Sequence, residues 1–234
     1  MKARYAAHAT TAVFATLSCQ IPSLELSGKA CPCVDGFTCD EARNVCVEGD
    51  LIFEDDFKGG LSKWSIVRGD WSTNPNGALQ RDPAVDAVML ATGFEAARYY
   101  RVETRFRRRT GGDEDGAMEI VVRFGSSGMY HCNYEPGTGK LFFQREDSTG
   151  TISETIPAPV AGLPPDPDAW FTMNVELRPS ESGERVGCWI DELPASARID
   201  SGDPRGLRYG AGTFGLKTWH KPAEFAFIKV YAAR

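Results

Sequence analysis

The chain has 234 residues and a formal net charge of −6, with acidic and basic side chains intermixed. This balance is typical of a soluble surface and provides no basic field for nucleic acid. The one basic run, Arg105 with Arg107–Arg109, is followed by the acidic loop Asp113–Asp115, and we expect these two to compensate each other. No nucleic-acid partner is therefore predicted.

The first nineteen residues have the pattern of an export signal. Two basic residues open it, a short apolar stretch covers 12–17, and a small residue precedes Cys19. The segment is too short and too polar to span a bilayer. Bacterial lipoproteins usually carry Leu three residues before the lipidated cysteine, but here that position is Thr16. We expect lipidation of Cys19 and anchoring at the outer membrane or cell surface, the alternative being a secreted or periplasmic protein cut near this point.

Six further cysteines follow Cys19, four of them within residues 31–46. In an exported protein such cysteines form disulfides, and their even number allows all of them to pair. A zinc site is the alternative for the clustered four, but Cys31 and Cys33 are separated by one residue and no histidine lies nearby. Three pairings of the four stay open. The cysteines expected to pair are Cys31, Cys33, Cys39, Cys46, Cys132 and Cys188.

Residues 20–50 are rich in turn-forming residues and poor in apolar ones. A segment of this length cannot bury enough surface to fold on a core, so cross-links must hold it. The sequence therefore divides into a signal (1–19), a Cys-rich knot with its linker (20–50) and a larger domain (51–234).

From Leu51 onward the sequence is typical of antiparallel β-structure. Apolar residues alternate with polar ones in short segments separated by turn residues, and no window keeps helical periodicity over three turns. Strands are expected at 51–57, 64–67, 78–81, 86–91, 99–108, 117–124, 129–135, 141–145, 151–156, 170–178, 185–191, 212–219 and 223–232. So many short strands predict an all-β, two-sheet sandwich or barrel.

Two distant cysteines occupy apolar positions of these strands. Cys132 is in register with Tyr130 and Tyr134, and Cys188 is in register with Val186. Both thiols are therefore expected to point inward, where an oxidising compartment favours a disulfide. The alternative is two separate buried thiols.

The order of landmarks in 51–234 resembles the concanavalin A-like lectin/glucanase superfamily, which has a two-sheet antiparallel jelly-roll fold. The segments that carry the resemblance are Phe53–Phe57 with Trp64, Gly69–Trp71, Tyr100–Phe106, Trp170–Leu177, Gly212–Thr218 and Ala223–Tyr231. The superfamily includes lectins, glycanases, laminin-G-like modules and protein-binding domains, so the resemblance is specific for the fold and weak for function.

Two departures from the superfamily concern catalysis and metal binding. Its glucanases carry three acids as E-x-D-x-x-E, and the best match here is Glu119–Phe124, where Val121 and Phe124 replace the second and third acids. A lone glutamate cannot act as both acid and nucleophile, so no catalytic residue is assigned. Related carbohydrate-binding sandwiches bind calcium through an Asp of the last strand, where this chain has Ala226. No metal or other cofactor is therefore expected, and calcium is the alternative.

The candidate binding surface is the polar face of 99–108, 117–124, 129–135, 170–178 and 185–191, provided that these strands share one sheet. Aromatic rings on such a face stack on a pyranose while Arg, Asn and Glu hydrogen-bond to its hydroxyls. The alternative is a solvated face whose charges pair across strands. The predicted binding residues are Glu103, Arg105, Glu119, Arg123, His131, Asn133, Glu176 and Trp189.

Together these features predict a non-catalytic, lectin-like module at the cell surface. Its partner would be a glycan or a cell-surface polysaccharide, and it would meet a membrane only through the lipid on Cys19. Two alternatives remain. A glycoside-active enzyme requires two carboxylates that face each other across a cleft, and a structural or adhesion sandwich has no sugar site.

Overall fold

The computed structural model describes residues 37–40, 45–48, 50–94, 99–158, 166, 168–181, 183–194, 197–203 and 209–232. The predictions about Cys19, Cys31 and Cys33 lie outside these residues. The secondary-structure elements whose bounds lie in the described ranges are all β-strands. This part of the chain has no helix of the length and apolar character needed to cross a membrane.

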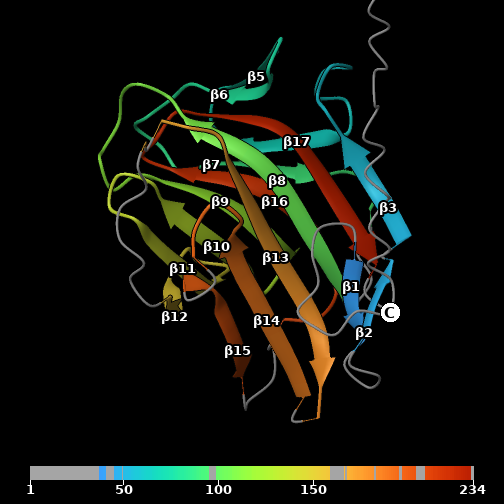
Figure 1. Ribbon diagram of the computed structural model, residues 1–234. Coiled ribbons are helices and arrows are strands. Elements are labelled where there is room, and N and C mark those ends of the chain that lie inside the picture. Colours follow the sequence, from blue (N-terminus) through green and yellow to red (C-terminus); the bar gives the residue numbers. More distant parts are fainter. Residues whose placement is uncertain are drawn as a thin grey trace, which may run out of the picture.

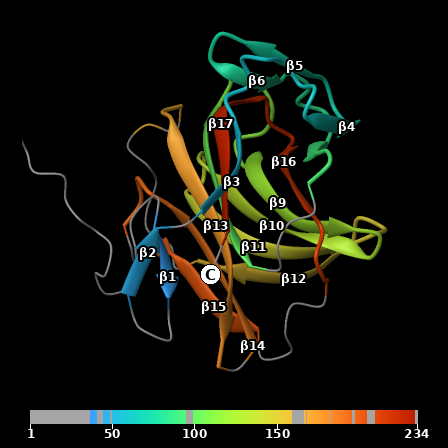
Figure 2. The same ribbon diagram turned by 90° about the vertical axis from the view of Figure 1, so that its right-hand side faces the viewer.

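Two antiparallel sheets face each other (Figures 1 and 2). The seven-stranded sheet runs in the order β12 (Ile152–Pro157), β11 (Lys140–Asp147), β10 (Gly128–Glu135), β9 (Ala117–Gly125), β16 (Thr213–Trp219), β7 (Ala87–Ala91) and β4 (Trp64–Arg68). The eight-stranded sheet runs in the order β15 (Ile199–Asp203), β14 (Gly183–Ile190), β13 (Phe171–Ser180), β8 (Tyr100–Arg108), β17 (Ala223–Ala232), β6 (Gly77–Gln80) and β5 (Trp71–Asn74), and β3 (Asp50–Asp55) pairs with β17. The predicted two-sheet jelly-roll sandwich is confirmed.

The core lies between the sheets because every second side chain of each strand points inward. Val102, Val175 and Val230 of the eight-stranded sheet are fully buried, as are Ile120 and Leu216 of the seven-stranded sheet. Burial of each such side chain stabilises the fold by about 1.5–3 kcal/mol. The same alternation turns the polar side chains of these strands to the two outer faces.

The predicted disulfide between Cys132 and Cys188 is confirmed. Cys132 lies on β10 and Cys188 on β14, with their Cα atoms 6.1 Å apart. Since the two strands belong to different sheets, this bond joins the layers through the core.

A β-bulge in β9 interrupts the alternation of inward and outward side chains at Arg123. Its φ is +52°, and the register between β9 and β16 shifts beside it. The side chain therefore turns inward and forms two hydrogen bonds of 3.1 Å to Glu184 of β14. The prediction that Arg123 lies on an open polar face is wrong, because the extra bulge residue reverses the direction of the side chain.

Four strands were missed from the sequence. β1 (Phe37–Asp40) and β2 (Val45–Glu48) pair as a hairpin within the Cys-rich segment, with Cys39 opposite Cys46 in the backbone register. β5 has four residues with only Trp71 buried, and β15 ends in Ser-Gly-Asp, so neither shows an apolar alternation. The pairing of the clustered cysteines stays a prediction.

The disulfide between the sheets yields a test of stability. The two cysteines are 56 residues apart, so loss of the cross-link in the variant C132A/C188A is expected to lower the free energy of unfolding by about 4 kcal/mol. Urea unfolding of the variant and of the oxidised wild-type chain measures this difference. Equal midpoints would show that the bond contributes nothing. The matched control is V175A, which truncates a core side chain of the same region without removing a cross-link.

Candidate functional site

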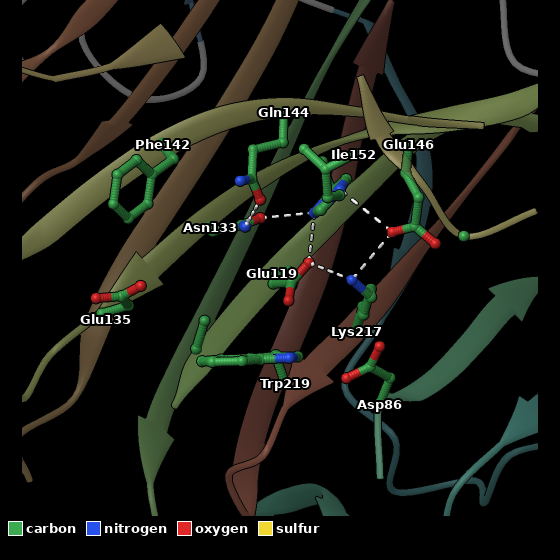
Figure 3. A pocket seen from close by; sticks show the side chains of 13 residues that line it. Asp86, Glu119, Asn133, Glu135, Phe142, Gln144, Glu146, Ile152, Lys217 and Trp219 are labelled. Atoms are coloured by element: carbon green, nitrogen blue, oxygen red, sulfur yellow. Dashed lines mark hydrogen bonds and ion pairs between the residues drawn. The ribbon is translucent and has the colours of Figure 1, made fainter. Parts of the chain in front are cut away.

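A pocket of about 360 Å³ opens on the outer face of the seven-stranded sheet (Figure 3). The strands that form its floor are neighbours in the sheet, so their outward side chains converge. Lys217 and Asn133 both stand directly opposite Glu119 in the strand register. The polar side chains of the floor are Glu119 of β9, His131 and Asn133 of β10, Gln144 and Glu146 of β11, and Lys217 of β16.

Four ionisable side chains form one buried network in this floor. The Lys217 ammonium lies 3.1 Å from Glu119 Oε2 and 3.3 Å from Glu146 Oε2. The imidazole of His131 bridges the same two carboxylates, with Nδ1 2.5 Å from Glu119 and Nε2 3.4 Å from Glu146. Each charge is therefore held by opposite or polar groups, as burial requires.

The network keeps Glu119 ionised. Burial alone would raise the pKa of Glu119, but the charges of Lys217 and His131 and their hydrogen bonds outweigh it and lower the pKa below its ordinary value of 4.5. For Lys217, burial alone would lower the pKa, but Glu119 and Glu146 raise it above its ordinary value of 10.5. The ion pair between Glu119 and Lys217 is thus present throughout the neutral pH range.

Amide groups and aromatic rings complete the pocket. Asn133 accepts a hydrogen bond from His131 Nδ1 over 2.7 Å and donates one to Gln144. Figure 3 shows Phe142 and Trp219 at separate margins of the pocket. The Trp219 ring stacks on His220, with the ring centroids 4.6 Å apart. The pocket thus presents fixed polar groups beside two apolar rings.

The predicted binding residues divide between two sheets. Of the eight, Glu119, His131 and Asn133 line this pocket. The premise that all five strands share one sheet is wrong, because β9 and β10 belong to the seven-stranded sheet while β8, β13 and β14 belong to the eight-stranded one. Arg123 lies between the sheets, and the other four lie on the opposite outer face.

On that opposite face the charged residues pair with each other. Glu176 Oε2 accepts a hydrogen bond of 2.7 Å from Arg178, and Glu103 lies 3.6 Å from the Arg101 guanidinium. Both glutamates are buried. The alternative interpretation of paired charges therefore fits Glu103 and Glu176, although these charges are buried rather than solvated.

Trp189 and Arg105 also lie on the eight-stranded sheet. The Arg198 guanidinium sits 3.8 Å from the centre of the Trp189 ring, and both residues line a smaller hollow of about 170 Å³. Arg105 is exposed, with its guanidinium 5.9 Å from the Trp170 ring. Neither residue reaches the polar network of the seven-stranded sheet.

The basic run and the acidic loop do not compensate each other as expected. Arg107 pairs with Glu224 at 2.6 Å, and Arg108 pairs with Asp168 at 2.5 Å. Asp113 of the acidic loop instead lies 3.0 Å from His220. The strand pairing of β8 with β17 brings Glu224 opposite Arg107, which the linear sequence does not reveal.

Several residues of the pocket were missed from the sequence. The alternation of β11 gives a signal for Gln144 and Glu146, since they share a face with Phe142. Lys217 had no such signal, because β16 pairs with β9 across a long sequence separation. Asp86 and Glu135 are further charged residues of the pocket that were missed, whereas Trp219 was expected as a possible rim contact.

Among the described residues, no three His, Cys, Asp or Glu side chains are grouped so that they could hold a metal ion. Asp55, one of the acids of the first predicted strand, has a structural role. Its carboxylate accepts hydrogen bonds from the Trp64 indole over 2.7 Å and from the Phe57 amide over 3.1 Å. It thereby holds the turn that follows β3.

Comparison with known proteins identifies the fold. No protein-family model matches the chain, and no curated protein matches it. The carbohydrate binding module CBM66 from Bacillus subtilis is similar with a TM-score of 0.57 and 19% identity, over 74% of this chain and 97% of that one. The Crh5 transglycosylase in complex with NAG has a TM-score of 0.58 and 12% identity, over 80% of this chain and 87% of that one. A Bacillus subtilis protein with a galectin-like fold has a TM-score of 0.56 and 13% identity, over 80% of this chain and 99% of that one. At these identities the likeness establishes the jelly-roll fold alone.

The shifted pKa values predict how stability depends on pH. Because the folded-state pKa of Glu119 is lowered, its ion pairs stabilise the fold above the ordinary value of 4.5, and this stabilisation is lost as the pH falls through the folded-state pKa. The variant E119Q is therefore expected to lose less stability on acidification than the wild type, and to be less stable at neutral pH by about 1–3 kcal/mol.

Urea unfolding of both proteins along a pH series measures this effect. E114Q serves as the control, because Glu114 is an exposed carboxylate outside the pocket. If the stability of E119Q falls on acidification as steeply as that of the wild type, the role of ionised Glu119 in stabilising the fold is contradicted.

Proposed function

We propose that this pocket binds a carbohydrate and that the protein is a non-catalytic glycan-binding module. The observation that carries the proposal is the set of fixed donors and acceptors beside the Trp219 and Phe142 rings. A sugar has hydroxyls along its edge and an apolar face, so it uses both kinds of group at once. The charge network holds these polar groups in place before a ligand arrives, which lowers the entropy cost of binding.

Size and fold support the same proposal. A volume of about 360 Å³ lies in the range of sites that bind small molecules. Among the proteins with a similar fold, one is named as a carbohydrate binding module and another is a transglycosylase in complex with NAG. A structural sandwich without a sugar site would have a flat or filled outer face, whereas this face is hollowed over charged side chains.

Hydrolysis is the alternative, because Glu119 and Glu146 face the same Lys217 ammonium. A glycosidase needs one carboxyl group with a raised pKa that protonates the leaving oxygen. Glu119 has a lowered pKa, and its Oε2 is already held by His131 and Lys217. Glu103 and Glu176 belong to the other sheet and cannot join it. These observations favour binding over catalysis.

We also propose that the protein acts outside the cytoplasm, anchored through Cys19 where that residue is lipidated. The disulfide between Cys132 and Cys188 supports an oxidising compartment. A module displayed at the cell surface meets glycans and polysaccharides directly.

A glycan array on the full chain tests the proposal with two matched tryptophan variants. W219A removes a ring from the pocket and is expected to weaken binding about tenfold. Stacking of the ring on a sugar contributes on the order of 1 kcal/mol to the binding free energy, in addition to the contribution of the apolar area that is buried. W189A removes a ring from the other sheet and is expected to change affinity less than about twofold. Thermal unfolding of both variants checks that they fold. Absence of binding by the wild type to every glycan would favour the structural alternative, and equal losses in both variants would place the site elsewhere.

A further inference from the structure

The pocket carries more negative than positive charge. Among its lining residues, Lys217 is the single lysine or arginine, and four carboxylates stand against it. Lys217 is already engaged by two of them, at 3.1 and 3.3 Å. The four carboxylates are those of Asp86, Glu119, Glu135 and Glu146.

The cations outside the pocket compensate the other two carboxylates only weakly. Arg68 lies 3.7 Å from Asp86 Oδ2, and Lys140 lies 3.8 Å from Glu135 Oε2. Both cationic side chains are 53% exposed, so solvent screens these long contacts. The field within the pocket therefore stays negative.

Two buried polar atoms in the pocket lack a hydrogen-bond partner among the described residues, namely Asp86 Oδ1 and His131 Nε2. The His131 side chain is only 1% exposed. Its Nδ1 faces the oxygens of Glu119 and Asn133, and its Nε2 lies 3.4 Å from Glu146 Oε2. The unpaired Asp86 oxygen belongs to a carboxylate and can only accept a hydrogen bond, so a donor is the group that would satisfy it.

We propose that the pocket selects a sugar with a free, protonated amino group and rejects acidic sugars. This inference rests on the proposed glycan-binding function. An ammonium group brings three donors and a positive charge to a pocket that offers four carboxylates, one of them with an unpaired oxygen, and a negative field. A uronic acid brings a carboxylate, which the same field repels. An N-acetylated sugar keeps its hydroxyls but loses the charge and two of the three donors.

Calorimetric titration of the full chain compares three oligosaccharides of equal length: glucosamine, N-acetylglucosamine and galacturonic acid, in a buffer in which the sugar amine is protonated. The glucosamine oligomer is expected to bind at least about tenfold more tightly than its N-acetylated form, and the galacturonic acid oligomer is expected not to bind. D86N should reduce the preference for the free amine about three- to tenfold. E114Q removes the same charge from an exposed site outside the pocket and should leave that preference unchanged.

The outcomes separate the two proposals. If the N-acetylated or the acidic oligomer binds as tightly as the glucosamine oligomer, the selectivity is overturned while glycan binding stands. If D86N and E114Q lower the affinity equally, the attraction is that of the whole acidic chain and the selectivity is again overturned. If none of the three oligomers binds and the glycan array is also blank, both proposals fail.

Discussion

Contact between the apolar faces of two sheets is the constraint on which the other features depend. The inward side chains of β9, β10, β11 and β16 fill the core. The side chains next to them in sequence point the other way and therefore lie together on one outer face. Those neighbours include charged residues, and the close strand spacing leaves them side by side. The polar network of the pocket is therefore a consequence of how the core is packed.

The network itself resolves a conflict between burial and charge. Glu119 and Lys217 are almost inaccessible to solvent, and an isolated charge in such a place is costly. Each lowers that cost for the other, and His131 adds a further polar contact. Glu119 and Lys217 each contact two other members of the network, and these several contacts restrict the positions of both side chains. A rigid polar floor is what recognition of a small polar ligand requires.

The two outer faces carry similar residue types but differ in the contacts and hollows that these residues form. On the eight-stranded sheet, Glu176 pairs with Arg178, and the Arg198 guanidinium lies over the Trp189 ring. Buried atoms without a hydrogen-bond partner occur on both sides among the described residues, such as Arg101 Nε on the eight-stranded sheet and Asp86 Oδ1 beside the seven-stranded one. The two faces differ in their hollows, of about 360 Å³ on the seven-stranded sheet and about 170 Å³ on the eight-stranded one, which residue composition does not reveal.

Much of the fold could be predicted from local patterns. Period-two alternation identified most strands, and it placed Cys132 and Cys188 on inward positions correctly. Such patterns are visible because neighbouring residues on one strand obey a fixed geometry. Arg123 was misplaced, since a bulge reverses the alternation without a clear sequence signal.

By itself, the sequence determined the β-class of the domain, its inward and outward positions, and the presence of Glu119, His131 and Asn133 on one polar face. Only the tertiary structure decided which strands lie beside each other. It separated Glu103 and Glu176 from Glu119, and it brought Lys217 and Glu146 to that residue. The physical reason is that strand order arises from the packing of whole sheets, through contacts between residues far apart in the chain.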